Sequence, residues 1–512
     1  MSISVTRQDP RYPALRKGNN IRFPATDADA AARIEICESV GDLAAALQRA
    51  VDAGQRPTVR SGGHCYENFV ANNPGGVILD VSFMNAVSRD ASGVYSIGPG
   101  AHLGDIYLNL YKKYGVTIPG GTCYGVGAGG HISGGGYGML SRLHGLTVDW
   151  LSAVDILTVN AQGKVEHLSV DRSHDPDLFR ACRGAGGGNF GIVTEFRFDK
   201  LPQAPEAVME AHLRFPWADM TEDRFVAILT TLGEYFEKRG QDPDTFGLFV
   251  VGYLGQRGPN AQVTLSARYC NLDGTCCSTG ILEEFLARFN HCGPSGDLSA
   301  PPRAAASGSI PRHQDAAQLC AVPQFSRRLW LDATLDDGGG VGGGVRAKYK
   351  STYMKRGFSV AEARCFYKHL TREAHGTNVR GSVVEFTSYG GAINQQHLIA
   401  ETASAQRSSA MKLQFQTYWV NEADDAAHLQ WIRDFYTELY SGPDADPQHL
   451  GAPYPGGRYE GCYINYADSD MLAYDFWPQL YYGDRGLYPF LQEVKRRYDP
   501  NNIFHHALSI RP

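Results

Sequence analysis

The sequence predicts an α+β protein of two or three domains, and three observations support this class. Its 512 residues are enough to form several hydrophobic cores. Residues 34–60 show a short strand, then Ser39 as the cap of an amphipathic helix, then a second strand. After residue 203 the pattern changes to longer strands alternating with helices, which indicates a second domain.

The remaining elements follow from apolar spacing along the chain. A period of two predicts strands, and a period near 3.6 predicts helices. Strands are expected at residues 76–87, 94–98, 151–159, 165–169, 192–198, 246–253 and 412–418. Helices are expected at residues 104–114, 281–289 and 488–498, the last ended by Asp499 and Pro500. The glycine-rich residues 336–344 are expected to form a loop.

The charge balance favours a small-molecule substrate. The formal net charge is −6, and acidic and basic residues are mixed along the chain without long basic runs, which argues against a surface for nucleic acid or anionic lipid. The first residues lack the apolar core of a signal peptide, and no run of about eighteen apolar residues occurs. We therefore expect a soluble, cytoplasmic protein that does not bind nucleic acid or insert into a membrane.

The cysteines indicate ordinary thiols rather than a disulfide framework or a metal site. Eleven cysteines are an odd and sparse set in a chain of this length. The neighbouring Cys276 and Cys277 have no further Cys or His at the spacing of a zinc finger. We therefore expect no metal ion.

Two stretches match the G-x-G-x-x-G pattern of nicotinamide-dinucleotide binding, at residues 125–130 and 186–191. Their context argues against that function, because the first is followed by more glycine and the second by a strand rather than a helix. Glycines also let backbone N–H groups approach an extended anionic ligand closely. Such loops could wrap a dinucleotide, although residues 134–136 could equally form tight turns.

Six strings of the sequence resemble the berberine-bridge-enzyme-like branch of the vanillyl-alcohol-oxidase flavoprotein family. They are RSGGH at residues 60–64, PGGTC at 119–123, GVGAGGHISGGGYG at 125–138, GAGGGNFG at 184–191, YINYAD at 463–468 and YDPNNIF at 498–504. The resemblance covers most of the N-terminal part and the C-terminal end, and it is weaker between them.

The resemblance implies a PCMH-type FAD-binding domain made from two separate parts of the chain. We expect residues 1–203 to form its N-terminal part and residues 451–512 to complete it together with the active site. Residues 204–450 are then an α/β substrate domain with a large antiparallel sheet covered by helices. The implied cofactor is FAD, bound covalently through His64 to its 8α-methyl carbon and through Cys123 to ring carbon 6.

The matching strings also imply which residues contact the cofactor. Besides His64 and Cys123 these are Arg60, Ser61, Gly62, Gly63, Gly120, Gly121, Thr122, Val126, Gly127, Gly130, His131, Gly134, Gly188, Asn189, Gly191, Ile192, Val193, Lys412, Asn465 and Tyr466. Val126 matches the family's oxygen gate, where a small side chain favours an oxidase that releases hydrogen peroxide over a dehydrogenase.

Oxidation of an alcohol requires a base near the substrate oxygen, and the resemblance implies that Tyr466 is this base. A free phenol has a pKa of about 10, so a phenolate-type base needs a neighbouring positive charge or a second phenol. Positions that match such partners are Tyr137, Tyr389, Tyr463 and Lys412. Alternation in residues 412–418 puts Lys412 and Gln414 on one face. Gln414 matches a position where the family's founding enzyme uses glutamate as base, and glutamine cannot serve as one.

Four functions stay open from the sequence. The first is oxidation of a hydroxyl group on a sugar, glycoside or glycosylated secondary metabolite, with dioxygen as the electron acceptor. The second is oxidative ring closure or desaturation of a polyketide or alkaloid scaffold, which only substrate trials separate from the first. The third is a flavin-binding protein without turnover, and the fourth is a nicotinamide dehydrogenase. Whether the protein is a monomer or a dimer does not follow from the sequence.

Overall fold

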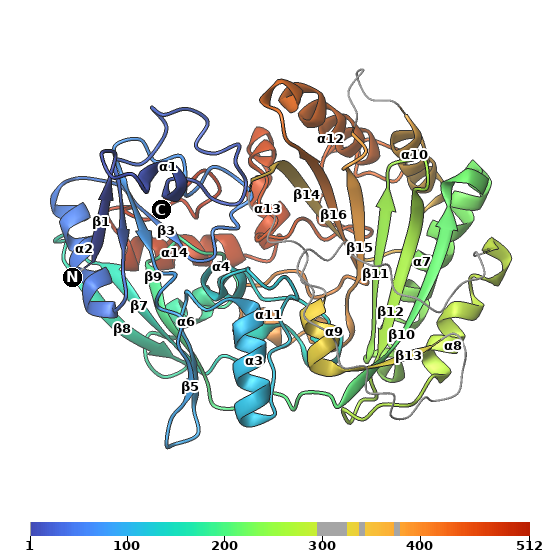
Figure 1. Cartoon of the computed structure of the whole chain (residues 1–512), viewed down its shortest axis with the longest axis horizontal. Helices are drawn as coiled ribbons and strands as arrows, with labels where there is room; N and C mark the ends of the chain where they lie inside the picture. Colours follow the sequence, from blue (N-terminus) through green and yellow to red (C-terminus); the bar gives the residue numbers. More distant parts are fainter. Residues whose placement is uncertain (1, 294–324, 337–343, 373–378) are drawn as a thin grey trace.

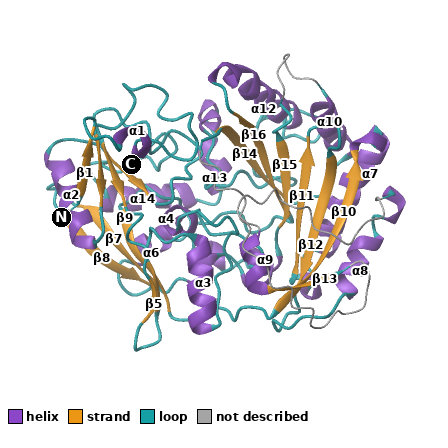
Figure 2. Cartoon of the chain, in the orientation of Figure 1, coloured by secondary structure: helices purple, strands orange, loops and turns teal. Residues whose placement is uncertain are grey.

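The protein consists of two halves that face each other, as the computed structural model shows (Figure 1). The structure describes residues 2–293, 325–336, 344–372 and 379–512. Two smaller sheets form the core of one half, and one large sheet forms the core of the other. Loops occupy much of the region between the sheets (Figure 2).

The first half contains a four-stranded and a five-stranded sheet. The four-stranded sheet has the order β1-β2-β4-β3, in which β2, β4 and β3 are parallel and β1 is antiparallel to β2. Its strands are β1 (Ile3–Thr6), β2 (Arg33–Ile36), β3 (Pro57–Arg60) and β4 (Val77–Asp80).

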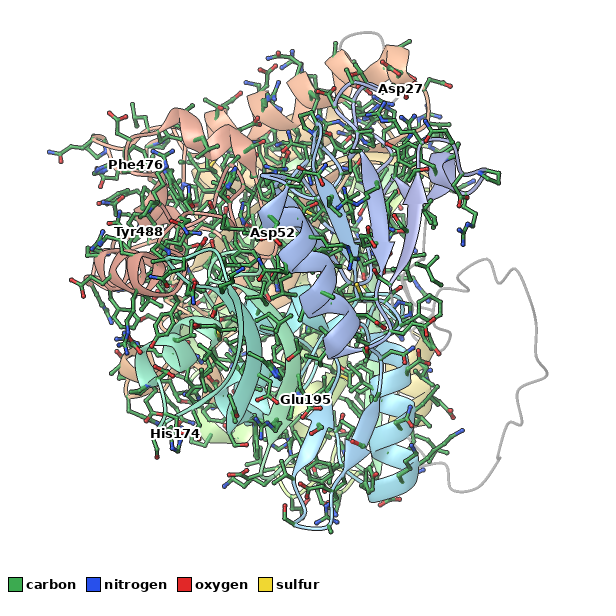
Figure 3. All side chains as sticks on the ribbon, turned by 90° about the vertical axis from the view of Figure 1, so that its left-hand side faces the viewer. Asp27, Asp52, His174, Glu195, Phe476 and Tyr488 are labelled. Carbon is green, nitrogen blue, oxygen red and sulfur yellow. The ribbon has the colours of Figure 1, made fainter. Side chains whose placement is uncertain are left out.

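The five-stranded sheet is antiparallel, with the order β5-β6-β9-β7-β8. Its strands are β5 (Val87–Arg89), β6 (Tyr95–Ile97), β7 (Ala153–Val159), β8 (Val165–Asp171) and β9 (Ile192–Phe198). On the side of the molecule shown in Figure 3, Glu195 on β9 accepts a hydrogen bond of 2.9 Å from Ser96 on β6, which joins these neighbouring strands.

The second half is built on a seven-stranded antiparallel sheet with the order β13-β10-β12-β11-β15-β16-β14. All its strands come from the middle of the chain: β10 (Ala207–Pro216), β11 (Leu248–Gly255), β12 (Gln262–Tyr269), β13 (Ser326–Leu329), β14 (Arg346–Met354), β15 (Val383–Ser388) and β16 (Met411–Trp419).

Three long helices cover the outer face of this sheet (Figures 1 and 2). They are α7 (Glu222–Arg239), α10 (Val360–Thr371) and α12 (Asp425–Leu439), and α10 contacts both of the others. The predicted α+β class, with a large antiparallel sheet covered by helices, is confirmed. Within the described residues, no helix is both long enough and apolar enough to cross a bilayer.

The other helices are shorter or belong to the first half. They are α1 (Tyr12–Leu15), α2 (Val40–Asp52), α3 (Leu103–Tyr114), α4 (Ala128–Ser133), α5 (Ser141–His144), α6 (Pro176–Cys182), α8 (Gly280–Ala287), α9 (Trp330–Asp336), α11 (Leu398–Glu401), α13 (Trp477–Tyr482) and α14 (Leu487–Tyr498). Ser39 caps α2 as predicted, because its hydroxyl accepts the backbone N–H of Asp42 at 3.2 Å.

Two expectations about the elements need correction or fall outside the structure. The strand expected over residues 76–87 is wrong as one unit, because β4 ends at Asp80 and β5 begins at Val87. Between them the chain turns with a hydrogen bond from Met84 N–H to the carbonyl of Val81, and both side chains are buried in the core rather than alternating across a sheet. The loop expected at residues 336–344 lies, except for its two end residues, outside the described residues.

The C-terminal segment returns to the first half and closes it. The side chain of Lys495 on α14 is fully buried and donates hydrogen bonds to the carbonyl of Asn189 and to the Asp499 carboxylate, both at 2.6 Å, and to the carbonyl of Phe504. The backbone of Ile510 donates to the Asn189 side chain at 2.9 Å. The end of the chain is thereby fixed to the glycine-rich loop before β9.

We expect Lys495→Met to destabilise the protein by about 3–5 kcal/mol, because it leaves a buried carboxylate without its partner. Burial lowers the pKa of Lys495 and raises that of Asp499, so each needs the other to remain charged. The matched control is Arg497→Met on the same helix, which removes an exposed ion pair with Asp177 and should cost less than about 1 kcal/mol. Thermal unfolding of the purified proteins measures the stability of both variants. Equal unfolding midpoints for the two variants would contradict a stabilising role of the buried Lys495–Asp499 pair.

Candidate active site

A cavity of about 790 Å³ lies between the two halves. This volume is within the range of about 300–1,000 Å³ that small-molecule and cofactor sites occupy. Most of the residues that the sequence predicts for the site line it: Arg60, Ser61, Gly62, Gly63, His64, Gly121, Thr122, Cys123, Val126, Gly127, Gly130, His131, Tyr137, Gly188, Asn189, Gly191, Ile192, Val193, Lys412, Gln414, Tyr463, Asn465 and Tyr466. The fold thus brings together segments that are 400 residues apart.

Three predicted residues, Gly120, Gly134 and Tyr389, do not line the cavity. Gly134 lies against Asn465 so closely that a Cβ there would be 2.1 Å from the Asn465 side-chain oxygen. Gly120 packs against Gly138 in a similar way, because a Cβ at Gly138 would be 1.7 Å from the carbonyl oxygen of Gly120. Tyr389 is fully buried and donates a hydrogen bond of 3.0 Å to the carbonyl of Gln406. These three residues support the cavity wall from behind.

The loop after β3 carries His64 into the cavity. Arg60 holds the start of this loop, because its guanidinium pairs with Asp80 at 2.6 Å and also donates to backbone carbonyls of residues 15 and 17. Arg60 therefore acts as a brace within the protein. The Nε2 atom of His64 is buried without a hydrogen-bond partner in the protein, and burial lowers the pKa of the imidazole. A neutral imidazole is the form that has a nucleophilic nitrogen.

The loop before α4 carries Cys123, whose exposed side chain borders the same cavity and forms no disulfide. His131 on α4 orders this loop, because its Nε2 accepts the backbone N–H of Gly121 at 3.0 Å. Burial lowers the pKa of His131 to about 4, which keeps it neutral and able to accept. His131 also fixes the C-terminal loop, since its carbonyl accepts a hydrogen bond of 3.0 Å from Asn465.

A lysine surrounded by tyrosines forms the polar centre of the cavity. Lys412 on β16 is 2 % exposed, and its Nζ donates a hydrogen bond of 3.2 Å to the Tyr466 hydroxyl. The same nitrogen lies 4.1 Å from the ring centre of Tyr137 and 5.0 Å from that of Tyr463. Burial lowers the pKa of Lys412 to about 7, against the opposite effect of the charges of Glu385 and Cys123.

The surroundings of Tyr466 do not lower the pKa of its hydroxyl. Burial, with further contributions from Tyr66 and Glu385, raises the pKa of Tyr466 well above its ordinary value. The resting hydroxyl is therefore a neutral phenol. Its neighbour Lys412 is the group whose charge changes near neutral pH.

The sequence reasoning did not identify a second wall of the cavity, which is polar and aromatic. Tyr66 stacks on Tyr349 of β14 with 3.6 Å between ring centres, and it accepts a hydrogen bond of 2.9 Å from Gln414. Glu385 of β15 accepts a hydrogen bond of 3.0 Å from Gln416. The alternation that placed Lys412 and Gln414 on one face of β16 also predicts Gln416 and Tyr418 there, so it could have found part of this wall.

The residues of the cavity fit a bound FAD on three observations. An imidazole nitrogen of His64 is buried without a partner and faces a cavity that Cys123 also borders. Gly62 and Gly127 both line the cavity, and their backbones approach so closely that a Cβ at Gly62 would be 2.5 Å from the Gly127 nitrogen, so these positions require glycine. Gly188 adopts a φ of +74° in the third loop.

Comparison with known proteins agrees with this site. Residues 31–169 match the model of an FAD binding domain, and residues 462–511 match the berberine and berberine-like model. The aclacinomycin-N/aclacinomycin-A oxidase of Streptomyces galilaeus is 35 % identical over 100 % of this chain and 90 % of its own length. The hexose oxidase of Chondrus crispus is 33 % identical over 98 % of this chain and 94 % of its own length.

A crystal structure of a glycopeptide hexose oxidase complexed with teicoplanin superimposes with a TM-score of 0.85 and 33 % identity, over 100 % of this chain and 99 % of that one. Fold, site and comparisons together define an FAD-dependent oxidoreductase with a PCMH-type flavin-binding domain. The chain belongs to the berberine-bridge-enzyme-like family of FAD-linked oxidases. The division into residues 1–203, 204–450 and 451–512 stays a prediction.

Proposed function

We propose that the chain oxidises a hydroxyl group of a sugar, a glycoside or a glycosylated secondary metabolite, and that dioxygen is reduced to hydrogen peroxide. The observation that carries the proposal is the Lys412–Tyr466 hydrogen bond of 3.2 Å inside a cavity that His64 and Cys123 also line. A proton acceptor and two attachment points for a flavin thus face one space.

In this proposal a ring nitrogen of His64 would replace a hydrogen of the 8α-methyl group of FAD, and the sulfur of Cys123 would replace the hydrogen on ring carbon 6. Each attachment releases two protons and two electrons, and dioxygen is the acceptor that this oxidation requires. A bound FAD would supply the hydride-accepting ring, with dioxygen as the final electron acceptor. The neutral imidazole of His64 and the cysteine thiol at the cavity border are the two nucleophiles that covalent attachment requires. Val126 borders the cavity three residues after Cys123, at the position predicted for oxygen access.

Tyr466 and Lys412 together accept the proton of the substrate hydroxyl. The raised pKa keeps Tyr466 a neutral phenol that already carries a proton, so it can take up the substrate proton only as its own proton passes to Nζ of Lys412. The hydrogen bond between the two groups provides the path, and the lowered pKa of Lys412 provides a neutral amine near pH 7. Proton removal then does not need a resting phenolate.

The second wall of the cavity suits a hydroxylated substrate. The stacked rings of Tyr66 and Tyr349 border the cavity with apolar surface, while Glu385, Gln414 and Gln416 offer hydrogen-bond acceptors and donors. The names of two relatives, a hexose oxidase and an aclacinomycin oxidase, agree with sugar and natural-product substrates.

The test is anaerobic mixing of the purified protein with hexoses, glycosides, glycosylated natural products and sugar-free polyketide scaffolds. Rapid loss of the flavin colour with a sugar-bearing compound, followed by stoichiometric peroxide on admission of air, would support the proposal. Bleaching by the sugar-free scaffolds alone would favour ring closure or desaturation instead. A yellow protein that no compound bleaches would indicate flavin binding without turnover.

A further inference from the structure

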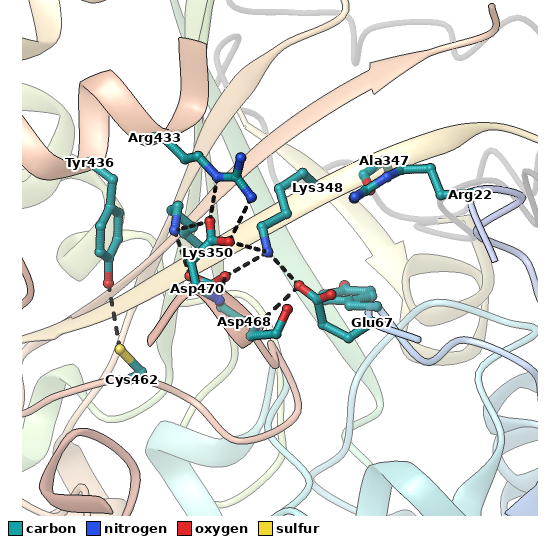
Figure 4. A network of polar contacts seen from close by, with 12 residues as sticks. Arg22, Glu67, Ala347, Lys348, Lys350, Arg433, Tyr436, Cys462, Asp468 and Asp470 are labelled. Atoms are coloured by element: carbon teal, nitrogen blue, oxygen red, sulfur yellow. Dashed lines mark hydrogen bonds and ion pairs between the residues drawn. The ribbon is translucent and has the colours of Figure 1, made fainter. Parts of the chain in front are cut away.

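Six charged side chains, four of them buried, form a chain of ion pairs that begins at the cavity (Figure 4). Their charges alternate along the chain, in the order Glu67, Lys348, Asp468, Lys350, Asp470 and Arg433. The first four side chains are at most 4 % exposed, whereas Asp470 and Arg433 reach the surface. We call this set the charge chain.

Lys348 has a special place in the charge chain, because its Nζ binds carboxylates from two different loops. It contacts Glu67 at 2.5 Å and Asp468 at 2.6 Å. Glu67 follows His64 by three residues, and Asp468 follows Tyr466 by two residues. One ammonium group on β14 therefore joins the loop of the proposed flavin attachment to the loop of the proposed base.

The neighbours of Lys348 reinforce this junction. On the other side of β14, Tyr349 stacks on Tyr66, so two consecutive strand residues hold two consecutive loop residues. The side chain of Asn20 donates hydrogen bonds of 3.0 Å to the carbonyls of both Tyr66 and Ala347. The backbone N–H of Ser469 donates to Glu67 at 3.3 Å, which links the two loops directly.

We propose that Lys348 is a positioning residue that holds the His64 loop and the Tyr466 loop at fixed positions relative to each other on β14. This inference rests on the proposed function. Without the ammonium group, Glu67 and Asp468 become two buried carboxylates that repel each other across the same site. The loops then separate, and both His64 and Tyr466 leave their places.

The electrostatics support a charged Lys348. Burial alone would lower its pKa, but the charges of Asp468, Glu67 and Asp470 outweigh burial and raise the pKa above its ordinary value. Lys350 differs in one useful respect: both carboxylates that it binds, Asp468 at 2.7 Å and Asp470 at 2.9 Å, follow Tyr466 closely in the chain. The two lysines can therefore separate the two roles.

The first experiment measures covalent FAD by mass spectrometry in a Cys123→Ala background, where only His64 can attach it. We expect Lys348→Met to reduce the His64-linked fraction by at least about tenfold, because a displacement of about 1 Å can cost about a hundredfold in rate. Lys350→Met should leave this fraction unchanged. The matched control is Arg346→Met. Arg346 lies on the same strand as Lys348 and pairs with Asp425 of α12, and its loss should also leave the fraction unchanged.

The second experiment uses a His64→Ala background, where FAD attached through Cys123 shows that the protein is folded. There, Lys348→Met and Lys350→Met should each slow flavin reduction by about tenfold or more, since both hold the Tyr466 loop. Full His64 attachment together with an unchanged reduction rate in Lys348→Met would overturn the inference. Equal losses in Arg346→Met would overturn it too, by showing general damage to β14.

Failure of the proposed function looks different. If Cys123→Ala alone carries no covalent FAD, attachment through His64 is wrong whatever Lys348 does. The role of Lys348 is then tested by the rate of flavin reduction in Lys348→Met protein that contains FAD, whether or not this FAD is covalently bound.

Discussion

Tyr466→Phe is expected to slow flavin reduction by the substrate by about 10²–10⁴-fold, the usual contribution of a general base. In the proposed mechanism the substrate proton reaches Lys412 through the hydroxyl of Tyr466, and phenylalanine removes this hydroxyl while keeping the ring that packs 4.9 Å from Tyr463. Substrate affinity should change little. Anaerobic stopped-flow measurement of flavin reduction over a range of substrate concentrations separates the two quantities.

The matched control is Tyr389→Phe. Tyr389 carries the same functional group and was also predicted for the site, but its hydroxyl binds the Gln406 carbonyl away from the cavity. Its loss should leave the reduction rate within a few-fold of wild type. If both variants reduce their flavin more slowly than wild type by the same factor, the hydroxyl of Tyr466 has no special role in proton transfer.

The second large effect is expected in the pH dependence of flavin reduction. Burial lowers the pKa of Lys412 to about 7, and the amine that accepts the proton is the deprotonated form. The rate should therefore rise with pH through about 7 and then level off. In Lys412→Met no amine remains, and Tyr466 would have to ionise alone at a pKa well above its ordinary value. We expect a loss of about 10²-fold or more at pH 8, with no rise near pH 7.

Gln414→Leu is the control for the pH profile. Gln414 lies two residues along β16 on the same face and binds Tyr66, so its loss alters the wall without removing the amine. It should weaken substrate binding and keep the rise near pH 7. A rise near pH 7 that survives in Lys412→Met would assign the titration to another group.

Much of the fold could be predicted from the sequence because local patterns were strong. Ser39 and the apolar spacing after it fix α2, and the turn at residues 160–163 joins β7 and β8 in the expected hairpin. The strand expected at residues 76–87 failed for a tertiary reason. Val81 and Met84 look like strand residues, but they pack into the core from a turn, which apolar spacing alone does not distinguish from a strand.

The candidate site was predicted as a set of positions but not as an arrangement. The family strings marked His64, Cys123 and Tyr466, and all three line one cavity. Their protonation states depend on burial, which appears only when residues distant in sequence pack together. The resting phenol of Tyr466 and the lowered pKa of Lys412 are of this kind.

The partners that come from elsewhere in the chain were also beyond sequence reasoning. Tyr349 and Lys348 lie in the middle of the chain, where the family resemblance is weakest, and no local pattern connects them to the loop of residues 64–67. Their pairing with Tyr66 and Glu67 follows from the position of β14 at the edge of the large sheet.

The most direct test of the central claim is acid denaturation of the purified yellow protein, followed by absorbance and mass measurement of the chain. The wild type should keep its colour and the mass of FAD, and His64→Ala and Cys123→Ala should each keep both. The double variant should lose them. A wild-type chain that releases its flavin on denaturation, or that carries none, would contradict attachment through His64 and Cys123.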